Sequence, residues 1–374
     1  MPLFIYLNNV EENIKRIKNY TKKEVMAVIK SDAYGIGAVK IIESLIKASI
    51  NFFVFEKYQE YKKCKIYLKQ NKVLIMESVS KSIIENETNN DVIFTINSYL
   101  DYLNIKDIEK KRKIHIRVDT GMNRFGIRNL QECKKIINGL KENENIIIDG
   151  IYTHFSSSLF ESNYYEKQRR IFQEYTNLYN FPIIHANATK NLHKTIIGNF
   201  VRVGMAMYGY HQPFIRLKST VSLIEKPVNI FNPKKLIKVG YTQISTKHVV
   251  GVIPLGYNEV DLTTVRYIVN NNQKYKLIGK SCMNHSHFIA DDEINYLSWL
   301  SILPKNDIIV GSDDYIFPRQ EDWYKILTSM KNIPKAYILR SKYDLPKVFK
   351  YRGEKSFRTR FRKRGNKIID TRAI

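Results

Sequence analysis

Eight short apolar runs rich in branched residues recur through the first two-thirds of the chain. Stretches with helical spacing separate most of them. Continuous apolar strands that alternate with helices are typical of a parallel sheet covered on both faces. Eight such units predict an α/β fold, a (β/α)8 TIM-like barrel, with a doubly wound open sheet as the structural alternative. The runs are VMAVIK (25–30), FFVF (52–55), VLIM (73–76), VIFTI (92–96), IHIRVD (114–119), IDGIYTH (148–154), PIIHAN (182–187) and VRVGMAMYG (201–209).

Two of the intervening segments illustrate the helical pattern. LQECKKIINGLKE (130–142) is one of them, and AVKIIESLIKAS (38–49) is the other. In the second, four branched residues are expected on one face, which would pack against the sheet. These four are Ile41, Ile42, Leu45 and Ile46.

The pattern changes after about residue 230, where strand-like segments follow one another with few helical stretches. The segment NIFNPKK (229–235) is a suitable joint, because Asn and Pro interrupt both periodicities. We therefore expect a barrel domain over residues 1–230 and a mainly β C-terminal domain with a basic tail over 231–374. The expected strands lie within 241–256, 274–290, 306–317 and 335–340, and one helix is expected over 320–331.

The chain is strongly basic, since 61 Lys and Arg against 36 Asp and Glu give a net charge of +25. Part of this excess is local: the segment 347–367 has many basic residues and a single acidic one, Glu354. Such a segment can bind nucleic acid or an anionic membrane. No nucleic-acid-binding motif accompanies it, so a solvated tail is the favoured interpretation and nucleic-acid binding is not expected.

The sequence indicates a cytoplasmic protein without a membrane partner. No apolar run has the length of a membrane span, and the N-terminus does not have the pattern of a signal peptide. Cys64, Cys133 and Cys282 are scattered singly, which argues against a disulfide framework.

Several polar residues fall at the ends of the predicted strands, where the active sites of barrels lie. Each alone is weak evidence, but five such strand ends at one mouth indicate a site. They are Lys30, Asp119, His154, the pair His185 and Asn187, and Arg202 with Gly204. No residues have the spacing of a metal site, so no metal is expected. Glycine-rich nucleotide loops of the Rossmann or Walker type are also absent.

Lys30 closes the first apolar run and is followed by a turn with Gly35 and Gly37. Burial of a lysine lowers its pKa, and the neutral amine can form a Schiff base with an aldehyde. Pyridoxal phosphate is the cofactor that uses this chemistry next to an amino group. The glycine-rich turn and the helix start after it could lie near the phosphate.

At these residues the sequence resembles the alanine racemase family, the fold-type III pyridoxal-phosphate enzymes. AVIKSDAYGIG (27–37) resembles the family's cofactor-lysine motif, and VDTGMNRFG (118–126) resembles its DTGM-x-R-x-G segment. Five further segments match in the family's order, so the resemblance spans nearly the whole chain. These are IYTHFSSS (151–158), HANAT (185–189), VRVGMAMYG (201–209), VIPLGYNEV (252–260) and GKSCMNHSHF (279–288).

The resemblance implies the reacting groups. Lys30 would hold pyridoxal 5'-phosphate covalently and act as one acid/base group, and Tyr257 would act as the other on the opposite face. In the family this tyrosine comes from the partner subunit, so a homodimer with shared active sites is implied. Arg124 and the backbone N–H of Met283 would bind the carboxylate of a small amino-acid substrate.

The resemblance also implies the cofactor-binding residues. Arg202 would meet the pyridine nitrogen, and His154 would link Arg202 toward the catalytic tyrosine. Tyr34, with the backbone of Gly204 and Met205, would bind the phosphate. A tyrosine has an ordinary pKa of about 10, so cationic neighbours are needed for it to act as a base.

Several positions depart from the family's pattern, among them the end of GYNEV, which lacks the family's terminal glycine. Ala188 replaces a phosphate-binding serine, although adjacent Thr189 could compensate. Arg117 replaces a lysine that is often carbamylated, Asn284 replaces an aspartate beside the carboxylate pocket, and Lys331 aligns with a phosphate-binding tyrosine. These residues surround the phosphate and the carboxylate pocket, so they bear on affinity and substrate identity.

The leading hypothesis is an alanine racemase that interconverts L-alanine and D-alanine and supplies the D-isomer for peptidoglycan. A racemase of another amino acid, serine or lysine, is an alternative on the same scaffold. A non-catalytic pyridoxal-phosphate-binding or nucleic-acid-binding derivative is a second class. Retention of both Lys30 and Tyr257 favours the enzyme, because a protein that only binds needs no second base.

Overall fold

A computed structural model describes residues 3–156, 162–210, 214–242, 244–263, 265–270, 273–303, 323–338 and 368–370. The chain folds into two compact units. Unit 2 comprises residues 14–33 and 45–207. Unit 1 comprises residues 1–13, 34–44 and 208–374, as far as they are described. The domain boundary expected between residues 230 and 231 stays a prediction.

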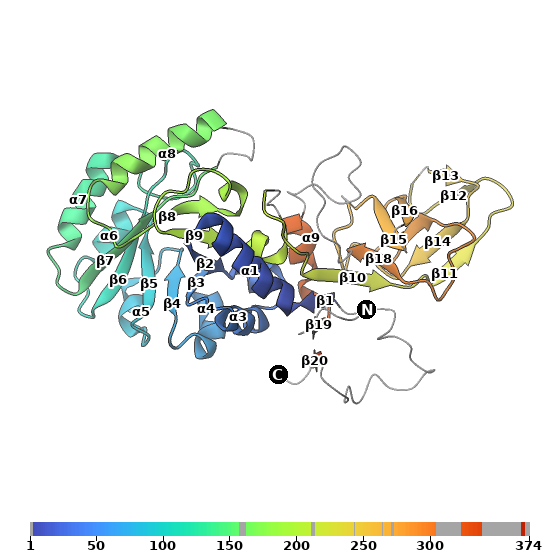
Figure 1. The fold of residues 1–374 in the computed structure, drawn as a ribbon, viewed down its shortest axis with the longest axis horizontal. Helices are drawn as coiled ribbons and strands as arrows, with labels where there is room; N and C mark the ends of the chain where they lie inside the picture. The colour runs from blue at the N-terminus through green and yellow to red at the C-terminus, as the bar shows by residue number, and fades with distance from the viewer. Residues whose placement is uncertain are drawn as a thin grey trace. The chain divides into compact units, whose positions relative to one another are not determined.

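Unit 2 contains a closed barrel of parallel strands, in the order in which they occur along the chain (Figure 1). The last strand pairs with the first in parallel, which completes the ring. The (β/α)8 prediction is therefore confirmed, and the open-sheet alternative is wrong. The strands are β2 (Glu24–Val28), β3 (Phe52–Phe55), β4 (Lys72–Ile75), β5 (Val92–Ile96), β6 (Arg112–Arg117), β7 (Ile146–Tyr152), β8 (Ile183–Ala188) and β9 (Phe200–Val203).

Each of the eight apolar runs corresponds to one barrel strand. Each strand begins within two residues of the first residue of its run. The last strand is shorter than its run, because the chain leaves the extended conformation after Val203 and forms a short 3-10 helix, η3 (Met205–Tyr208). The apolar strand residues are nearly all buried, as a parallel sheet covered on both faces requires.

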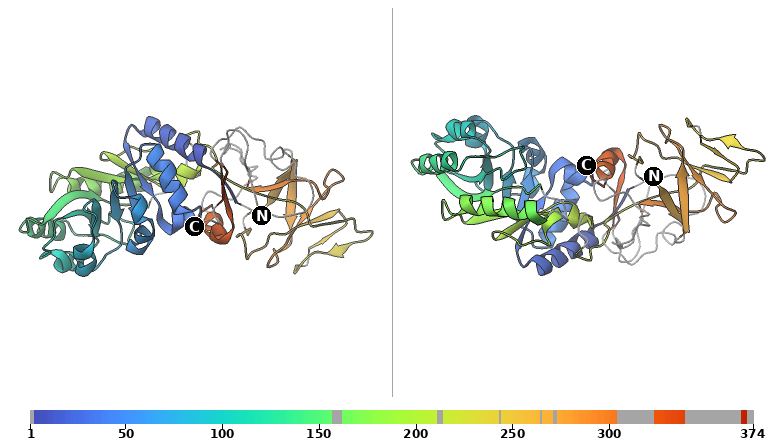
Figure 2. Two further views of the ribbon diagram at one scale, coloured as in Figure 1. Left: turned by 90° about the horizontal axis from the view of Figure 1, so that it is seen from below. Right: turned by 90° about the horizontal axis from the view of Figure 1, so that it is seen from above.

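Most helices follow a barrel strand and lie outside the ring (Figure 2), whereas the first helix, over residues 7–21, precedes the first barrel strand. Capping side chains begin several of them: Ser80, Ser98 and Asn129 each accept hydrogen bonds from the first helical turn. Among the described residues, no helix is both long and apolar enough to cross a membrane. The helices are α1 (Leu7–Thr21), α3 (Ala38–Lys47), α4 (Tyr58–Cys64), α5 (Lys81–Asn86), α6 (Tyr99–Ile105), α7 (Leu130–Leu140) and α8 (Ser162–Thr176).

The apolar face predicted for residues 38–49 needs one correction. Ile41, Ile42 and Leu45 are fully buried, whereas Ile46 is 39% exposed. Successive residues of a helix are about 100° apart around its axis, so Ile46 points away from the apolar stripe that Ile42 and Leu45 belong to. Ala38 extends this stripe at the start of the helix.

Unit 1 contains a ten-stranded sheet, drawn partly in yellow and orange in Figure 1. Its N-terminal strand β1 (Leu3–Tyr6) pairs antiparallel with β10 (Val221–Glu225) and parallel with β19 (Lys335–Ile338). Sequence analysis missed β1, because its four residues run without a break into α1. The other strands are β11 (Asn229–Phe231), β14 (Val250–Ile253), β15 (Tyr267–Asn270), β16 (Gln273–Ile278), β17 (Ser286–Ile289), β18 (Leu300–Leu303) and β20 (Ile368–Asp370).

The mainly β character predicted for the C-terminal part is confirmed. A separate two-stranded sheet is formed by β12 (Ile237–Lys238) and β13 (Ser245–Thr246). The predicted helix corresponds to α9 (Trp323–Ser329) followed by the 3-10 turn η4 (Met330–Asn332). Part of the expected joint is strand β11. The strand predicted within 306–317 and the basic segment 347–367 lie outside the described residues.

Candidate active site

Lys30 lies two residues after the last residue of β2, at the carboxyl end of the barrel strand. Its Nζ atom forms an ion pair with Oε2 of Glu56, the residue after β3, at 3.1 Å. The lysine side chain is 32% exposed, so it is less buried than the sequence suggested. A primary amine therefore stands at the barrel mouth with a carboxylate as its partner.

The backbone after Lys30 is left-handed. Ser31, Asp32 and Ala33 have φ of 53° and ψ between 47° and 50°, and Tyr34 has φ of 61°. This conformation costs roughly 1–2 kcal/mol per non-glycine residue, so it persists only where other contacts impose it. One such contact is visible: Ser31 N–H donates to Oε1 of Glu60 at 2.7 Å. The short segment α2 (Lys30–Tyr34) is thus a strained turn that starts at the lysine.

Arg202, in β9, is clamped by the ends of the neighbouring strands. Its Nη1 donates to Nδ1 of His185 at 2.6 Å and to the His185 carbonyl at 3.0 Å. Its Nη2 donates to the carbonyls of Thr153 at 2.6 Å and Ala186 at 3.0 Å. Burial lowers the pKa of Arg202 to about 10, so its guanidinium stays charged at neutral pH. Its Nε–H has no acceptor among the described residues.

His154, the strand-end histidine after β7, lies beside this guanidinium. Its Nδ1 is 3.4 Å from Nη2 of Arg202. Burial, and then the charges of Arg202, Arg124, Arg117 and Lys30, lower the pKa of His154 well below its ordinary value. His154 is therefore neutral, and its Nδ1 faces a donor, which assigns the proton to Nε2. Of the predicted His154–Arg202 pair, Arg202 is therefore the cation and the imidazole is neutral.

Sequence reasoning missed His115 and Asp149, which continue a chain of polar groups from Arg202 and His185 into the barrel. Nε2 of His185 lies 3.0 Å from Nδ1 of His115, and Nε2 of His115 lies 3.4 Å from Oδ2 of Asp149. Both histidines are fully buried, which lowers the pKa of each imidazole. His115 and Asp149 stand inside two of the apolar runs, and a polar residue within such a run was the signal that could have revealed them.

Asp119 organises the loop that carries Arg124. Its Oδ1 accepts from the backbone N–H groups of Gly121, Met122 and Asn123, at 2.9 to 3.0 Å. Burial raises the pKa of Asp119, but these bonds and Arg128 outweigh it, so the pKa lies below its usual value. The strand-end aspartate is thus structural.

Arg124 is exposed and forms no hydrogen bond or ion pair with the described residues. Arg117, which replaces the family's lysine, is buried and lies over the rings of Phe125 at 5.3 Å and Tyr152 at 5.6 Å. It therefore supports the loop of Arg124 by stacking on Phe125, where a carbamylated lysine would offer a negative charge.

Thr189, the residue after Ala188, has its hydroxyl against the backbone that follows β9. Its Oγ1 accepts from the backbone N–H groups of Gly204 at 3.3 Å and Ala206 at 3.4 Å. A hydroxyl thus lies against the backbone that was predicted to bind a phosphate. Met205, between these two residues, is buried.

In unit 1, Tyr257 and Met283 occupy two adjacent turns. Tyr257 N–H donates to the carbonyl of Cys282 and Asn258 N–H to that of Met283, both at 3.0 Å. The turns approach so closely that a Cβ on Gly256 would stand 2.2 Å from the Cys282 oxygen, which requires a glycine there. The side chains of Tyr257 and Met283 are 59% and 57% exposed, so both project from the unit.

Asn284 and Glu259 tie the same two turns together. Nδ2 of Asn284 donates to Oε1 of Glu259 at 2.7 Å, and Oε2 of Glu259 accepts from Gly256 N–H at 3.0 Å. The amide that replaces the family's aspartate is therefore the donor partner of a carboxylate.

The remaining predicted residues are also placed within unit 1. Tyr34 is buried, with its ring edge-on to Tyr208 at a centroid distance of 5.9 Å. Lys331 is exposed in η4. Lys30, Arg124, His154, Arg202, Gly204 and Met205 belong to unit 2, so the joining of the two groups into one site stays a prediction.

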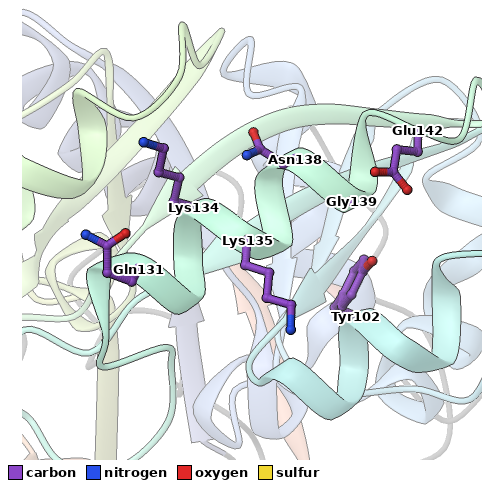
Figure 3. A pocket seen from close by; sticks show the side chains of 7 residues that line it. All are labelled: Tyr102, Gln131, Lys134, Lys135, Asn138, Gly139 and Glu142. Carbon is purple, nitrogen blue, oxygen red and sulfur yellow. The ribbon is translucent and has the colours of Figure 1, made fainter.

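A surface pocket elsewhere in unit 2 does not involve these residues. It lies between α6 and α7 and is lined by polar side chains such as Gln131, Lys134 and Glu142 (Figure 3). In the described part of the chain, no three His, Cys, Asp or Glu side chains are grouped as a metal site would require.

Comparisons with known proteins agree with this fold. The family model described as alanine racemase, N-terminal domain, matches residues 5–212, more than half of the chain. An alanine racemase of Borreliella burgdorferi is 29% identical over 316 residues, covering 75% of this chain and 82% of the relative.

Two solved structures share the fold. An alanine racemase from Bartonella henselae with covalently bound pyridoxal phosphate gives a TM-score of 0.76 at 20% identity, covering 88% of this chain and 96% of the other. A histidine racemase from Leuconostoc mesenteroides gives 0.72 at 18% identity, covering 91% and 98%. By the family match, by these relatives and by its barrel with a β domain, the chain belongs to the alanine racemase family.

Proposed function

We propose that this protein is a pyridoxal-phosphate-dependent racemase that interconverts L-alanine and D-alanine, with Lys30 and Tyr257 as the two acid/base groups. Its family membership and the amine at the barrel mouth support this proposal. Racemisation removes a proton from one face of Cα and delivers one to the other. Two groups on opposite faces achieve this without moving a single base around the substrate.

The observation that carries the proposal is the state of Arg202. Strand-end acceptors engage both Nη atoms of this buried guanidinium, and only Nε–H is left without an acceptor among the described residues. This N–H is therefore available to an acceptor supplied by a ligand. The pyridine nitrogen of the cofactor is such an acceptor, and the residues present therefore fit the group.

The cofactor, when bound, would withdraw electrons from the Cα–H bond of the amino acid and so acidify it. Lys30 would hold it through Nζ and move a proton on one face. Arg202, as a donor that keeps its own proton, would leave the ring nitrogen unprotonated. His154, neutral and with Nε2–H free of Arg202, would offer a hydrogen bond toward the phenol of Tyr257.

The carboxylate of the substrate would bind Arg124 and the backbone N–H of Met283. Arg124 suits this role because it is charged, exposed and free of an acidic partner in the described residues. Tyr34 and the backbone at Gly204 and Met205 would bind the phosphate, with Thr189 in place of the missing serine hydroxyl.

We further propose a homodimer in which Tyr257 reaches the site of the partner. A catalytic phenol that projects 59% exposed from its own turn needs a surface that encloses it, because proton transfer at Cα requires exclusion of water. A soluble cytoplasmic enzyme supplying D-alanine for peptidoglycan is the role that fits this activity.

The test combines cofactor titration with chiral product analysis. The wild-type chain should develop visible absorbance with added pyridoxal phosphate and convert L-alanine to a racemic mixture. Lys30→Ala should lose the absorbance. Tyr257→Phe should keep the absorbance and lose conversion, whereas Tyr241→Phe, at another exposed tyrosine of the same unit, should keep both.

The same panel separates the alternatives. Preferential conversion of serine, lysine or histidine would contradict the proposed substrate and would leave the proposed two-base mechanism in place. A chain that takes up the cofactor and converts no amino acid would be a non-catalytic binder. A chain that takes up no cofactor would contradict the proposal altogether.

A further inference from the structure

The barrel interior contains the hydrogen-bonded chain Asp149–His115–His185–Arg202, here called the polar chain. The donor and acceptor in each hydrogen bond of the polar chain are determined by the groups at its two ends. The guanidinium can only donate, so Nδ1 of His185 is an acceptor and the proton of that imidazole is on Nε2. The carboxylate can only accept when ionised, so Nε2 of His115 carries the proton and its Nδ1 accepts from His185.

The barrel is shaped to hold this chain. The register between β6 and β7 shifts after Ile114, so that Ile114 faces Ile148 and His115 faces Gly150. Asp149 is the extra residue of this bulge, and bulges re-aim side chains beside functional sites. Gly150 makes room for the ring, since a Cβ there would stand 2.7 Å from Nε2 of His115.

The middle of the polar chain, at His185, is also held in place by its neighbours. The ring of Tyr152 stacks on His185 with an interplanar angle of 10° and a centroid distance of 4.7 Å. A second register shift lies between His185 and Ala188, next to β9. Both shifts therefore occur where members of the polar chain enter the barrel.

We propose that Asp149 and His115 are positioning residues for Arg202. Through the polar chain they keep His185 in the tautomer whose Nδ1 accepts from Arg202 Nη1, and they thereby hold the guanidinium with its Nε–H free for the ring nitrogen of the cofactor. This inference rests on the proposed function for the identity of that acceptor. The hydrogen bonds of the polar chain join residues of the protein only, so they do not depend on a bound cofactor.

The first test needs no variant. Nitrogen-15 NMR of the histidine-labelled protein distinguishes the two tautomers and the charged imidazole, and the chain has only eight histidines to assign. His115 and His185 should both be neutral Nε2–H tautomers. A proton on Nδ1 of either ring, or a charged ring, would overturn the polar chain.

The second test removes the acceptor at the outer end. Asp149→Ala leaves Nε2–H of His115 without its partner, so the His185 resonances should shift and the affinity for pyridoxal phosphate should fall on the order of 10- to 100-fold, as for other supporting hydrogen bonds around a bound group. Asp149→Asn keeps an acceptor oxygen and should restore most of both. Asp91→Ala, which removes a carboxylate that precedes β5 and pairs with Lys113 of β6, is the matched control.

Unchanged His185 resonances and wild-type cofactor affinity in Asp149→Ala would refute the positioning role. A shared loss of affinity in Asp149→Ala and Asp91→Ala would also refute it, because a general loss of stability would then explain both. Failure of the wild-type protein to take up the cofactor would contradict the proposed function instead, and the tautomers would still decide the polar chain.

Discussion

Nζ of Lys30 and Oε2 of Glu56 lie 3.1 Å apart, and each side chain is about one-third exposed. The lysine must leave this carboxylate and lose a proton before its nitrogen can attack an aldehyde. Glu56→Gln removes the charge that holds it, so the visible absorbance should develop faster after mixing with pyridoxal phosphate. A partly exposed pair is worth at most about 1 kcal/mol, so the acceleration should be no more than about fivefold.

The control for this variant is Glu43→Gln, which breaks the ion pair of Glu43 with Lys40 at 3.0 Å on α3. It should leave the rate of uptake unchanged. Slower uptake in Glu56→Gln than in the wild type would mean that the carboxylate assists the lysine, for example by accepting its proton, and would contradict this prediction.

Thr189 should contribute to cofactor affinity through its hydroxyl. Thr189→Ala removes the group that lies against the N–H groups of Gly204 and Ala206, and a hydrogen bond to a charged phosphate is worth about 1.5–3 kcal/mol. The dissociation constant for pyridoxal phosphate, measured by absorbance titration, should rise about 10- to 100-fold. Thr189→Ser keeps the hydroxyl and should stay close to the wild type; equal losses in both variants would assign the effect to the methyl group and its packing.

The barrel strands could be predicted because each is a continuous apolar run, which burial on both faces requires. The pairing of β1 with β10 and β19 could not, because it joins four N-terminal residues to segments more than two hundred residues further along the chain. Local periodicity carries no information on such partners. A strand that passes directly into a helix also lacks the turn residues that would mark its end.

Sequence motifs singled out Lys30, Arg202 and Tyr257 as candidate site residues, but they did not reveal the groups that hold these side chains. Glu56 was missed because the segment after its strand contains several charged residues with helical spacing, and nothing in the sequence distinguishes Glu56 from them. Asp149 reaches His115 only through a bulge, and a shift of register by one residue has no signature in the apolar pattern. The left-handed backbone at Ser31–Ala33 was equally hidden, since none of these residues is a glycine.

The bond from Asn284 to Glu259 should fix the turn of Tyr257. Asn284→Asp places a second carboxylate at the 2.7 Å contact, so like charges would push the two turns apart. We expect a lower kcat at neutral pH and a loss of about 1 kcal/mol of stability, because the groups are partly exposed. The double variant Asn284→Asp with Glu259→Gln exchanges donor and acceptor, and it should recover both in a double-mutant cycle. Additive losses would show that the two side chains act independently.

Asp119 should make the stability of the protein depend on acid pH. Its pKa in the folded state lies below the unfolded value of about 4, because the hydrogen bonds from Gly121, Asn123, Arg128 and Met122 together outweigh burial. A carboxyl group shifted in this direction contributes stability that is complete above its unfolded pKa and is lost as the pH falls through the folded pKa.

Asp119→Asn should therefore lower the free energy of unfolding at pH 7 by about 1–3 kcal/mol. The variant should also flatten its decline between about pH 5 and pH 3, as measured by urea unfolding at several pH values. The neutral amide keeps an oxygen for the three backbone N–H groups, so the loop should persist and the difference from the wild type should shrink as the pH falls. Parallel pH curves for the two proteins would show that Asp119 is not the titrating group and that its bonds to the loop do not depend on charge.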